Sequence, residues 1–140
     1  MDLRQVYTQI IKEHNGNGYH KHHLKAPTDS KEGVNPSCGD QITLELKIKD
    51  DVIMEAAFTG YGCAISQASA DMMIDIIEGK DIHEARKLIS LFMRMIRNEL
   101  TEEDDIELLE DATALKDIAH MPARVKCAVL GWHTLEEMLP

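Results

Sequence analysis

Aromatic residues and long apolar runs are scarce in this sequence. Phe, Trp and Tyr make up 4 % of the 140 residues, so we expect a mainly aliphatic core in which the eight methionines fill gaps. No apolar run approaches the roughly 20 residues that a membrane-spanning helix needs. Charged residues also interrupt the apolar positions of residues 1–11, unlike a secretory signal. The sequence therefore predicts a cytoplasmic protein without a membrane partner.

Basic residues are in deficit. The chain has 15 Lys and Arg against 25 Asp and Glu, a formal net charge of −10 at pH 7. A nucleic-acid-binding protein needs a basic face that neutralises phosphates, so this balance excludes nucleic acid as a partner. Residues 99–111 contain eight acids and no base. We interpret them as a solvated segment that docks loosely through Ile106, Leu108 and Leu109.

Cysteine is also rare, with three residues in the chain. An odd count in a chain without a secretory signal does not fit a disulfide framework. Metal binding or catalysis is the better interpretation of these thiols.

Two segments alternate apolar and polar residues with the period of two that is typical of a half-buried strand. They are residues 41–48 and 52–58, and a tight turn between them predicts a hairpin. Helical spacing of apolar residues predicts helices over residues 2–13, 64–77 and 81–98, and a last helix that begins at Pro122. Without an internal repeat or a linker, residues 1–140 are predicted to form a single α+β domain.

Residues 14–40 are rich in Gly, Asn, His, Lys and Pro and have no clear period. They predict an irregular loop. We interpret His20, His22 and His23 as part of a solvated basic loop, with adventitious metal binding as the alternative.

The cysteines and one aspartate fall at the ends of predicted elements. Cys38 and Asp40 precede the first strand of the hairpin, Cys63 lies between the second strand and a helix, and Cys127 is near the start of the last helix. Such ends can converge at one edge of a small α+β domain. Three thiolates and one carboxylate form a reasonable tetrahedral zinc site.

Spacing alone leaves an alternative open, because no CxxC pair is present. Three separate buried cysteines that behave as small hydrophobes explain the spacing equally well. Gly39 beside Cys38 and Gly62 beside Cys63 favour the metal site. Glycine gives the backbone the freedom that close approach to an ion requires.

Three sequence motifs together resemble a known family. They are Asn-Pro-Ser-Cys-Gly-Asp at 35–40, Gly-Tyr-Gly-Cys-Ala-Ile-Ser-Gln-Ala-Ser-Ala at 60–70 and Arg-Val-Lys-Cys-Ala at 124–128. Over essentially the whole chain the sequence resembles the SufU branch of the IscU/NifU-N-type scaffold family of iron–sulfur cluster assembly. Lys126 stands where IscU proteins carry His, Asp71 stands where the second motif often continues with Ser, and an insertion typical of SufU falls around residues 86–111.

The resemblance implies a fold and a function. The fold would be a small three-stranded antiparallel sheet with about five helices packed on one face, with the third strand drawn from residues 20–27. Cys38, Asp40, Cys63 and Cys127 would bind Zn²⁺. Cys38 would accept persulfide sulfur from a SufS-type cysteine desulfurase and stimulate its turnover, with Arg124 assisting.

The protein would then act as a zinc-dependent sulfurtransferase and co-substrate, upstream of other Suf scaffold proteins. Whether it counts as an enzyme stays open. One alternative is a scaffold that assembles a [2Fe–2S] cluster, or holds iron, on the same ligands. A second alternative is a purely structural zinc.

Overall fold

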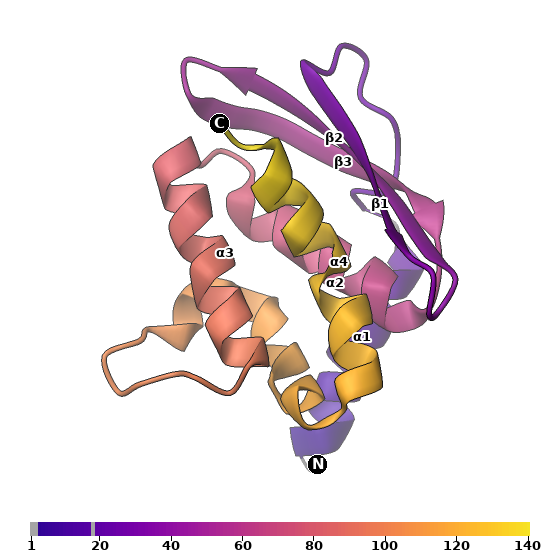
Figure 1. The fold of residues 1–140 in the computed structure, drawn as a ribbon, viewed down its shortest axis with the longest axis vertical. Coiled ribbons are helices and arrows are strands. Elements are labelled where there is room, and N and C mark those ends of the chain that lie inside the picture. The colour runs from indigo at the N-terminus through magenta and orange to yellow at the C-terminus, as the bar shows by residue number, and fades with distance from the viewer. Residues whose placement is uncertain (1–2, 18) are drawn as a thin grey trace.

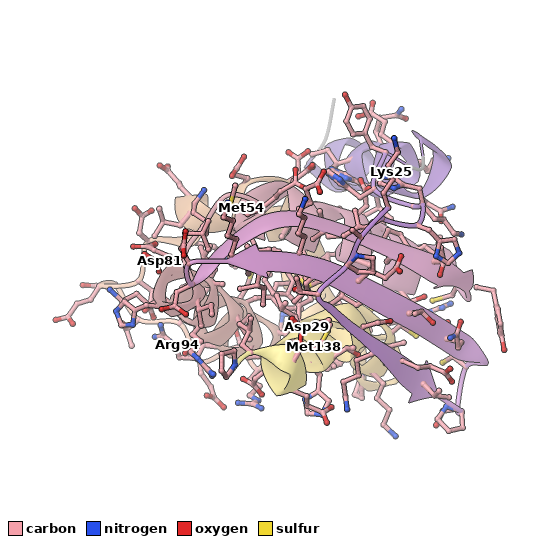
Figure 2. All side chains as sticks on the ribbon, turned by 90° about the horizontal axis from the view of Figure 1, so that it is seen from above. Lys25, Asp29, Met54, Asp81, Arg94 and Met138 are labelled. Carbon is pink, nitrogen blue, oxygen red and sulfur yellow. The ribbon has the colours of Figure 1, made fainter. Side chains whose placement is uncertain are left out.

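The computed structural model describes residues 3–17 and 19–140 of the chain. A three-stranded antiparallel sheet and five helices, one of them a 3₁₀ helix, confirm the α+β class. Helices pack against one face of the sheet, as Figures 1 and 2 show. In chain order the elements are α1 (Leu3–Asn17), β1 (Asp29–Asn35), β2 (Asp40–Lys49), β3 (Val52–Tyr61), α2 (Ala64–Ile77), α3 (Ile82–Ile96), η1 (Ile106–His120) and α4 (Pro122–Met138).

The predicted hairpin is formed by β2 and β3. Ile42, Leu44 and Leu46 of β2 are completely buried, as the alternating pattern predicts. Asp50 and Asp51 form the turn with φ angles of 53° and 62°. Both central residues of a type I′ turn have positive φ, and this turn matches the twist of the two strands that it joins.

The third strand lies further along the chain than expected. Residues 20–27 form no strand and contribute one isolated bridge, from Lys21 to Phe58. The strand is instead β1, which pairs with β2 in a register that sets Asn35 opposite Asp40. It is an edge strand, and its sequence has no apolar alternation. Gly33 lets α4 approach it so closely that an added Cβ would lie 2.1 Å from the Thr134 hydroxyl.

Helix α2 is the centre of the helical layer. Eleven of its 14 residues are buried, and it packs against both α1 and α4. The Ser69 hydroxyl donates to the Ala128 carbonyl at 2.6 Å and accepts from the Trp132 indole N–H at 3.0 Å. Trp132 is fully buried and stacks on Phe92. These contacts fix α4 along α2.

The acidic segment is better ordered than the sequence suggested. Residues 106–120 form η1, in which 3₁₀ turns are interrupted by a kink at Glu110 (φ 48°, ψ −127°), and Leu109, Ala112 and Leu115 are completely buried. Ile106 packs against the core, whereas Leu108 is exposed. Residues 106–120 therefore dock firmly by one face, while the SufU-type insertion around residues 86–111 stays a prediction. No described helix is long and apolar enough to cross a membrane.

Candidate metal centre

The fold brings together residues that lie far apart in the sequence. The Cys38 and Cys127 sulfur atoms and a carboxylate oxygen of Asp40 all lie within 4.8 Å of one another. Cys38 belongs to the β1–β2 connection, Asp40 begins β2, and Cys127 is in the second turn of α4. Asp40 and Cys127 are buried, whereas Cys38 is exposed. The alternative of three separate buried cysteines is therefore wrong.

Cys63 borders this group. It is the residue that precedes α2, and it is half-buried. Its thiol interacts with Cys127, although it lies outside the set of atoms that are mutually within 4.8 Å. Its backbone N–H donates to Asp40 Oδ1 at 2.8 Å. The fold thus gathers two sulfurs and one carboxylate oxygen, with a third sulfur at the edge of the group.

Asp40 is held by donors from three segments. Oδ1 accepts from the Cys63 N–H and, at 3.2 Å, from the Ser66 hydroxyl, and Oδ2 accepts from the Asn35 amide at 3.2 Å. A buried carboxylate is costly unless it is hydrogen-bonded. Such outer partners also orient a ligating carboxylate, since they fix which lone pairs stay free.

Asn35 and Ser66 belong to the site although sequence analysis gave them no role. The Asn35 amide also lies 3.8 Å from the Cys127 sulfur, at hydrogen-bonding distance for sulfur. Asn35 is 6 % exposed at the end of β1, and its register opposite Asp40 aims it at the cluster. The only signal in the sequence was that both residues fall inside the motifs around Cys38 and Cys63.

Burial raises the pKa of the Cys127 thiol, and the neighbouring Cys38, Cys63 and Asp40 side chains raise it further. Without a cation, these neighbouring acidic groups oppose formation of a thiolate at Cys127. A bound divalent cation reverses that effect, because it favours the deprotonated form of every ligand. The two sulfurs and the carboxylate oxygen that the fold brings together are ligand types that Zn²⁺ accepts.

Two glycines make the approach of the segments possible. Gly62 has φ 152°, and a Cβ there would lie 2.2 Å from Asp40 Oδ1 and 2.8 Å from the Ser66 hydroxyl. Gly39 has φ 70° between Cys38 and Asp40. Any other residue would be strained at either position.

Arg124 and Lys126 lie on α4 close to Cys127 in sequence, and both are exposed. Arg124 is three residues before Cys127, so it projects from the same side of the helix. Among the residues that the structure describes, the Arg124 guanidinium makes no ion pair with Asp40. Arg124 is therefore an exposed cation on the turn before Cys127 and does not pair with Asp40.

The sheet, the helical layer and the cysteine–aspartate cluster define a domain of the iron–sulfur cluster assembly class. The chain belongs to the NifU-like N-terminal domain family, which matches residues 6–139. It is 40 % identical over 139 residues to the iron–sulfur cluster assembly scaffold protein IscU of Thermotoga maritima, covering 99 % of this chain and 96 % of the relative. It is 41 % identical over 138 residues to the zinc-dependent sulfurtransferase SufU of Bacillus subtilis, covering 97 % and 90 %.

Solved structures agree with this assignment. A crystal structure of a SUF-system scaffold protein from Fervidobacterium islandicum superposes with a TM-score of 0.89 at 34 % identity, covering 98 % of both chains. The N-terminal part of a NifU-like protein from Brucella abortus, at 22 % identity, shares the fold with a TM-score of 0.83, covering 97 % of this chain and 93 % of that one.

Proposed function

We propose that this protein is a zinc-dependent sulfur-transfer protein of iron–sulfur cluster biogenesis. It accepts persulfide sulfur on Cys38 from a SufS-type cysteine desulfurase in the cytoplasm, and passes the sulfur on to downstream Suf scaffold proteins. The observation that carries this proposal is the uneven burial of the cluster. Cys38 is exposed, whereas Asp40 and Cys127 beside it are buried. The name of the Bacillus subtilis relative, a zinc-dependent sulfurtransferase, supports it.

The ligands of the zinc would be Cys38, Asp40, Cys63 and Cys127. When bound, zinc keeps the thiols deprotonated and protects them from oxidation. Asp40 and Cys127 anchor the site from within the fold, since protein donors already fix the Asp40 carboxylate. Cys38 can leave the cluster with the least disturbance, because its loop has no side chain at Gly39 to displace.

The transfer itself is a thiol exchange. The Cys38 thiolate attacks the terminal sulfur of the persulfide on the desulfurase cysteine. A new S–S bond forms at Cys38, the S–S bond on the desulfurase breaks, and the desulfurase cysteine leaves as a thiolate. The terminal S–H moves with its sulfur, so neither oxidant nor reductant is needed. Arg124, an exposed cation on the turn before Cys127, stabilises the Cys38 thiolate before the attack.

The test is replacement of Cys38 by Ala in the zinc-loaded protein, assayed with a SufS-type desulfurase. We expect stimulation of alanine release from cysteine to be lost, together with transfer of ³⁵S to this chain. The matched control is Ser37→Ala, which removes one atom from the adjacent exposed residue and should behave as the wild type. Undiminished stimulation and labelling by Cys38→Ala would refute the transfer role and leave a structural zinc.

A second candidate is a scaffold that assembles a [2Fe–2S] cluster on the same ligands. The relative in Thermotoga maritima, named as an iron–sulfur cluster assembly scaffold protein, favours it. Metal analysis and visible absorption of freshly purified protein separate the two candidates. Colourless protein with about one zinc per chain supports sulfur transfer. Brown protein that contains iron and acid-labile sulfide supports the scaffold.

A further inference from the structure

A second group of metal-ligating side chains lies outside the cysteine cluster. His14 of α1 and Asp71 and Asp75 of α2 offer one imidazole nitrogen and two carboxylate oxygens that all lie within 4.8 Å of one another. His14 Nδ1 is 2.6 Å from Asp71 Oδ2 and 3.8 Å from Asp75 Oδ2. Asp71 is eight residues beyond Cys63, which is about 12 Å along a helix. The two groups are therefore separate.

The atoms that do not face the centre of this group have partners of their own. The other nitrogen of His14, Nε2, lies 2.9 Å from Asp111 Oδ2 on η1. The backbone N–H of His20 donates to Asp71 Oδ1 at 3.1 Å, and His20 Nε2 lies 2.6 Å from Asp75 Oδ1. Metal-bound imidazoles and carboxylates usually have such outer partners, which fix the tautomer of the histidine and the orientation of the carboxylate.

We propose that His14, Asp71 and Asp75 bind a divalent transition-metal ion, with Asp111 and His20 as outer partners that orient the ligands. The inference is independent of the proposed sulfur transfer, because it uses none of the cysteines. The ion fastens α1, α2 and η1 together.

The space beside the ligands suits a hydrated ion. A cavity of about 270 Å³ is lined by His14, Asp71 and Asp75, together with Glu13 and Tyr19. Three protein ligands leave coordination positions open, and this cavity has room for the water molecules that would fill them. One nitrogen and two carboxylate oxygens suit Mn²⁺, Fe²⁺, Co²⁺ and Zn²⁺ but not metals that require thiolates.

The charge of the group also calls for a cation. Three aspartates converge there, and the Asp71 side chain is only 4 % exposed. Among the residues whose side chains the structure describes, 8–16 and 19–140, no lysine or arginine pairs with Asp71, Asp75 or Asp111. Burial of an unneutralised carboxylate is costly. A metal ion or a proton on a histidine would supply the positive charge.

A proton is the rival of the metal ion. Burial lowers the pKa of His14, but hydrogen bonds to Asp111 and Asp71 outweigh it, and the pKa is raised above the usual 6.5. A doubly protonated His14 would bridge Asp71 and Asp111 with one N–H to each. Such an imidazolium has no lone pair for a metal, so the two states exclude each other and can be distinguished by experiment.

The test is Mn²⁺ binding to the protein whose cysteine site already holds zinc. Mn²⁺ prefers oxygen and nitrogen ligands to thiolates, and electron paramagnetic resonance measures the free ion directly. We expect one saturable Mn²⁺ site per chain at neutral pH. Asp75→Asn should weaken binding at least tenfold, His14→Gln should abolish it, and Asp111→Asn should weaken it by about 10–100-fold as an outer partner.

Asp117→Asn is the matched control, because it removes the same charge from an exposed residue of η1. It should bind Mn²⁺ like the wild type. Asp75 is 42 % exposed, so Asp75→Asn keeps the test valid if His14→Gln loosens α1, and circular dichroism and zinc content report folding. Absence of saturable binding at millimolar Mn²⁺, or equal affinity in Asp75→Asn and the wild type, overturns the proposal. So does an NMR signature of doubly protonated His14 that persists in the presence of Mn²⁺.

Discussion

The two ligand clusters along α2 differ in both chemistry and support. The cluster at the start of the helix consists of the Cys38 and Cys127 sulfurs and Asp40, bordered by Cys63, and Cys38 is on an exposed loop. The cluster two turns further on consists of an imidazole and two carboxylates, and its ligands come from helices α1 and α2. Loop ligands can move without unfolding the domain, whereas helix ligands move only with the helices that bear them.

This contrast suggests a division of roles. The sulfur cluster combines a fixed interior with one accessible nucleophile, which is what group transfer requires. The imidazole–carboxylate cluster has no nucleophilic thiol and joins three helices. We infer that the first performs chemistry and that the second stabilises the N-terminal and acidic segments against α2. Further substitutions test this contrast.

The largest expected effect comes from Cys127→Ser. Cys127 is completely buried, so no other side chain can replace its sulfur. We expect loss of stoichiometric zinc and a fall of more than about 3 kcal/mol in the free energy of unfolding of the zinc-loaded protein. Metal analysis and urea unfolding measure both. Asp75→Asn serves as the control and should retain its zinc. Tightly bound zinc in Cys127→Ser would show that the buried thiol is not a ligand.

A smaller effect is expected from Gly62→Ala. The added Cβ would lie 2.2 Å from Asp40 Oδ1, in a backbone conformation with φ 152°. We expect a loss of about 2–3 kcal/mol in stability, together with weaker zinc binding and unchanged Mn²⁺ binding. Competition with a chelator and urea unfolding provide the measurements.

Gly16→Ala is the control for that substitution. Gly16 lies in α1, and a Cβ there meets nothing within 4 Å. Because alanine favours the helix, we expect this variant to gain up to about 1 kcal/mol. If Gly62→Ala were as stable as Gly16→Ala, close packing of residues 60–63 on Asp40 would not contribute to the stability of the fold.

The sequence predicted the elements whose pattern is local. The hairpin followed from alternation of apolar residues, and α2, α3 and α4 followed from helical spacing. The ends of these helices are also fixed locally: the Asp81 side chain accepts from the Glu84 N–H at 2.7 Å, and Gly79 has φ 86° after α2. In each case the deciding interactions lie within a few residues of one another.

The features that were missed depend on distant partners. Strand β1 carries the sequence Asp-Ser-Lys-Glu-Gly-Val-Asn, which has no strand pattern of its own and is ordered by β2 and α4. His20 was expected in a solvated loop, yet it is 9 % exposed and contacts Asp71 and Asp75, more than 50 residues away. Such pairings leave no trace in spacing. For the cysteines, likewise, spacing alone left separate burial open, and the family resemblance favoured one cluster.

The smallest expected effect concerns Asp104, a carboxylate of the acidic segment that already forms an ion pair with Arg94. The Thr101 N–H, 2.8 Å away, lowers the pKa of Asp104 below the usual 3.8, and Arg94 lowers it further, against the raising effect of burial. A lowered pKa in the folded state adds stability at every pH above 3.8. That stability is lost as the pH falls through the folded-state pKa, so the stability difference between the wild type and Asp104→Asn should shrink only in acid.

Arg94→Gln sharpens the comparison with the His14 cluster. Because the backbone N–H is the larger cause, the pKa of Asp104 should rise only partway towards 3.8 in this variant, as a ¹³C NMR titration of the carboxyl group would measure. Arg97→Gln is the control. It makes the same charge change at an exposed position directly after α3 and should leave that titration unchanged.

Mn²⁺ binding should be unchanged in both variants, since Asp104 already has a cationic partner and Asp71 does not. A full return of the pKa to 3.8 in Arg94→Gln would mean that the ion pair dominates. A loss of Mn²⁺ binding there would mean that the ion binds to the acidic segment and not to His14, Asp71 and Asp75.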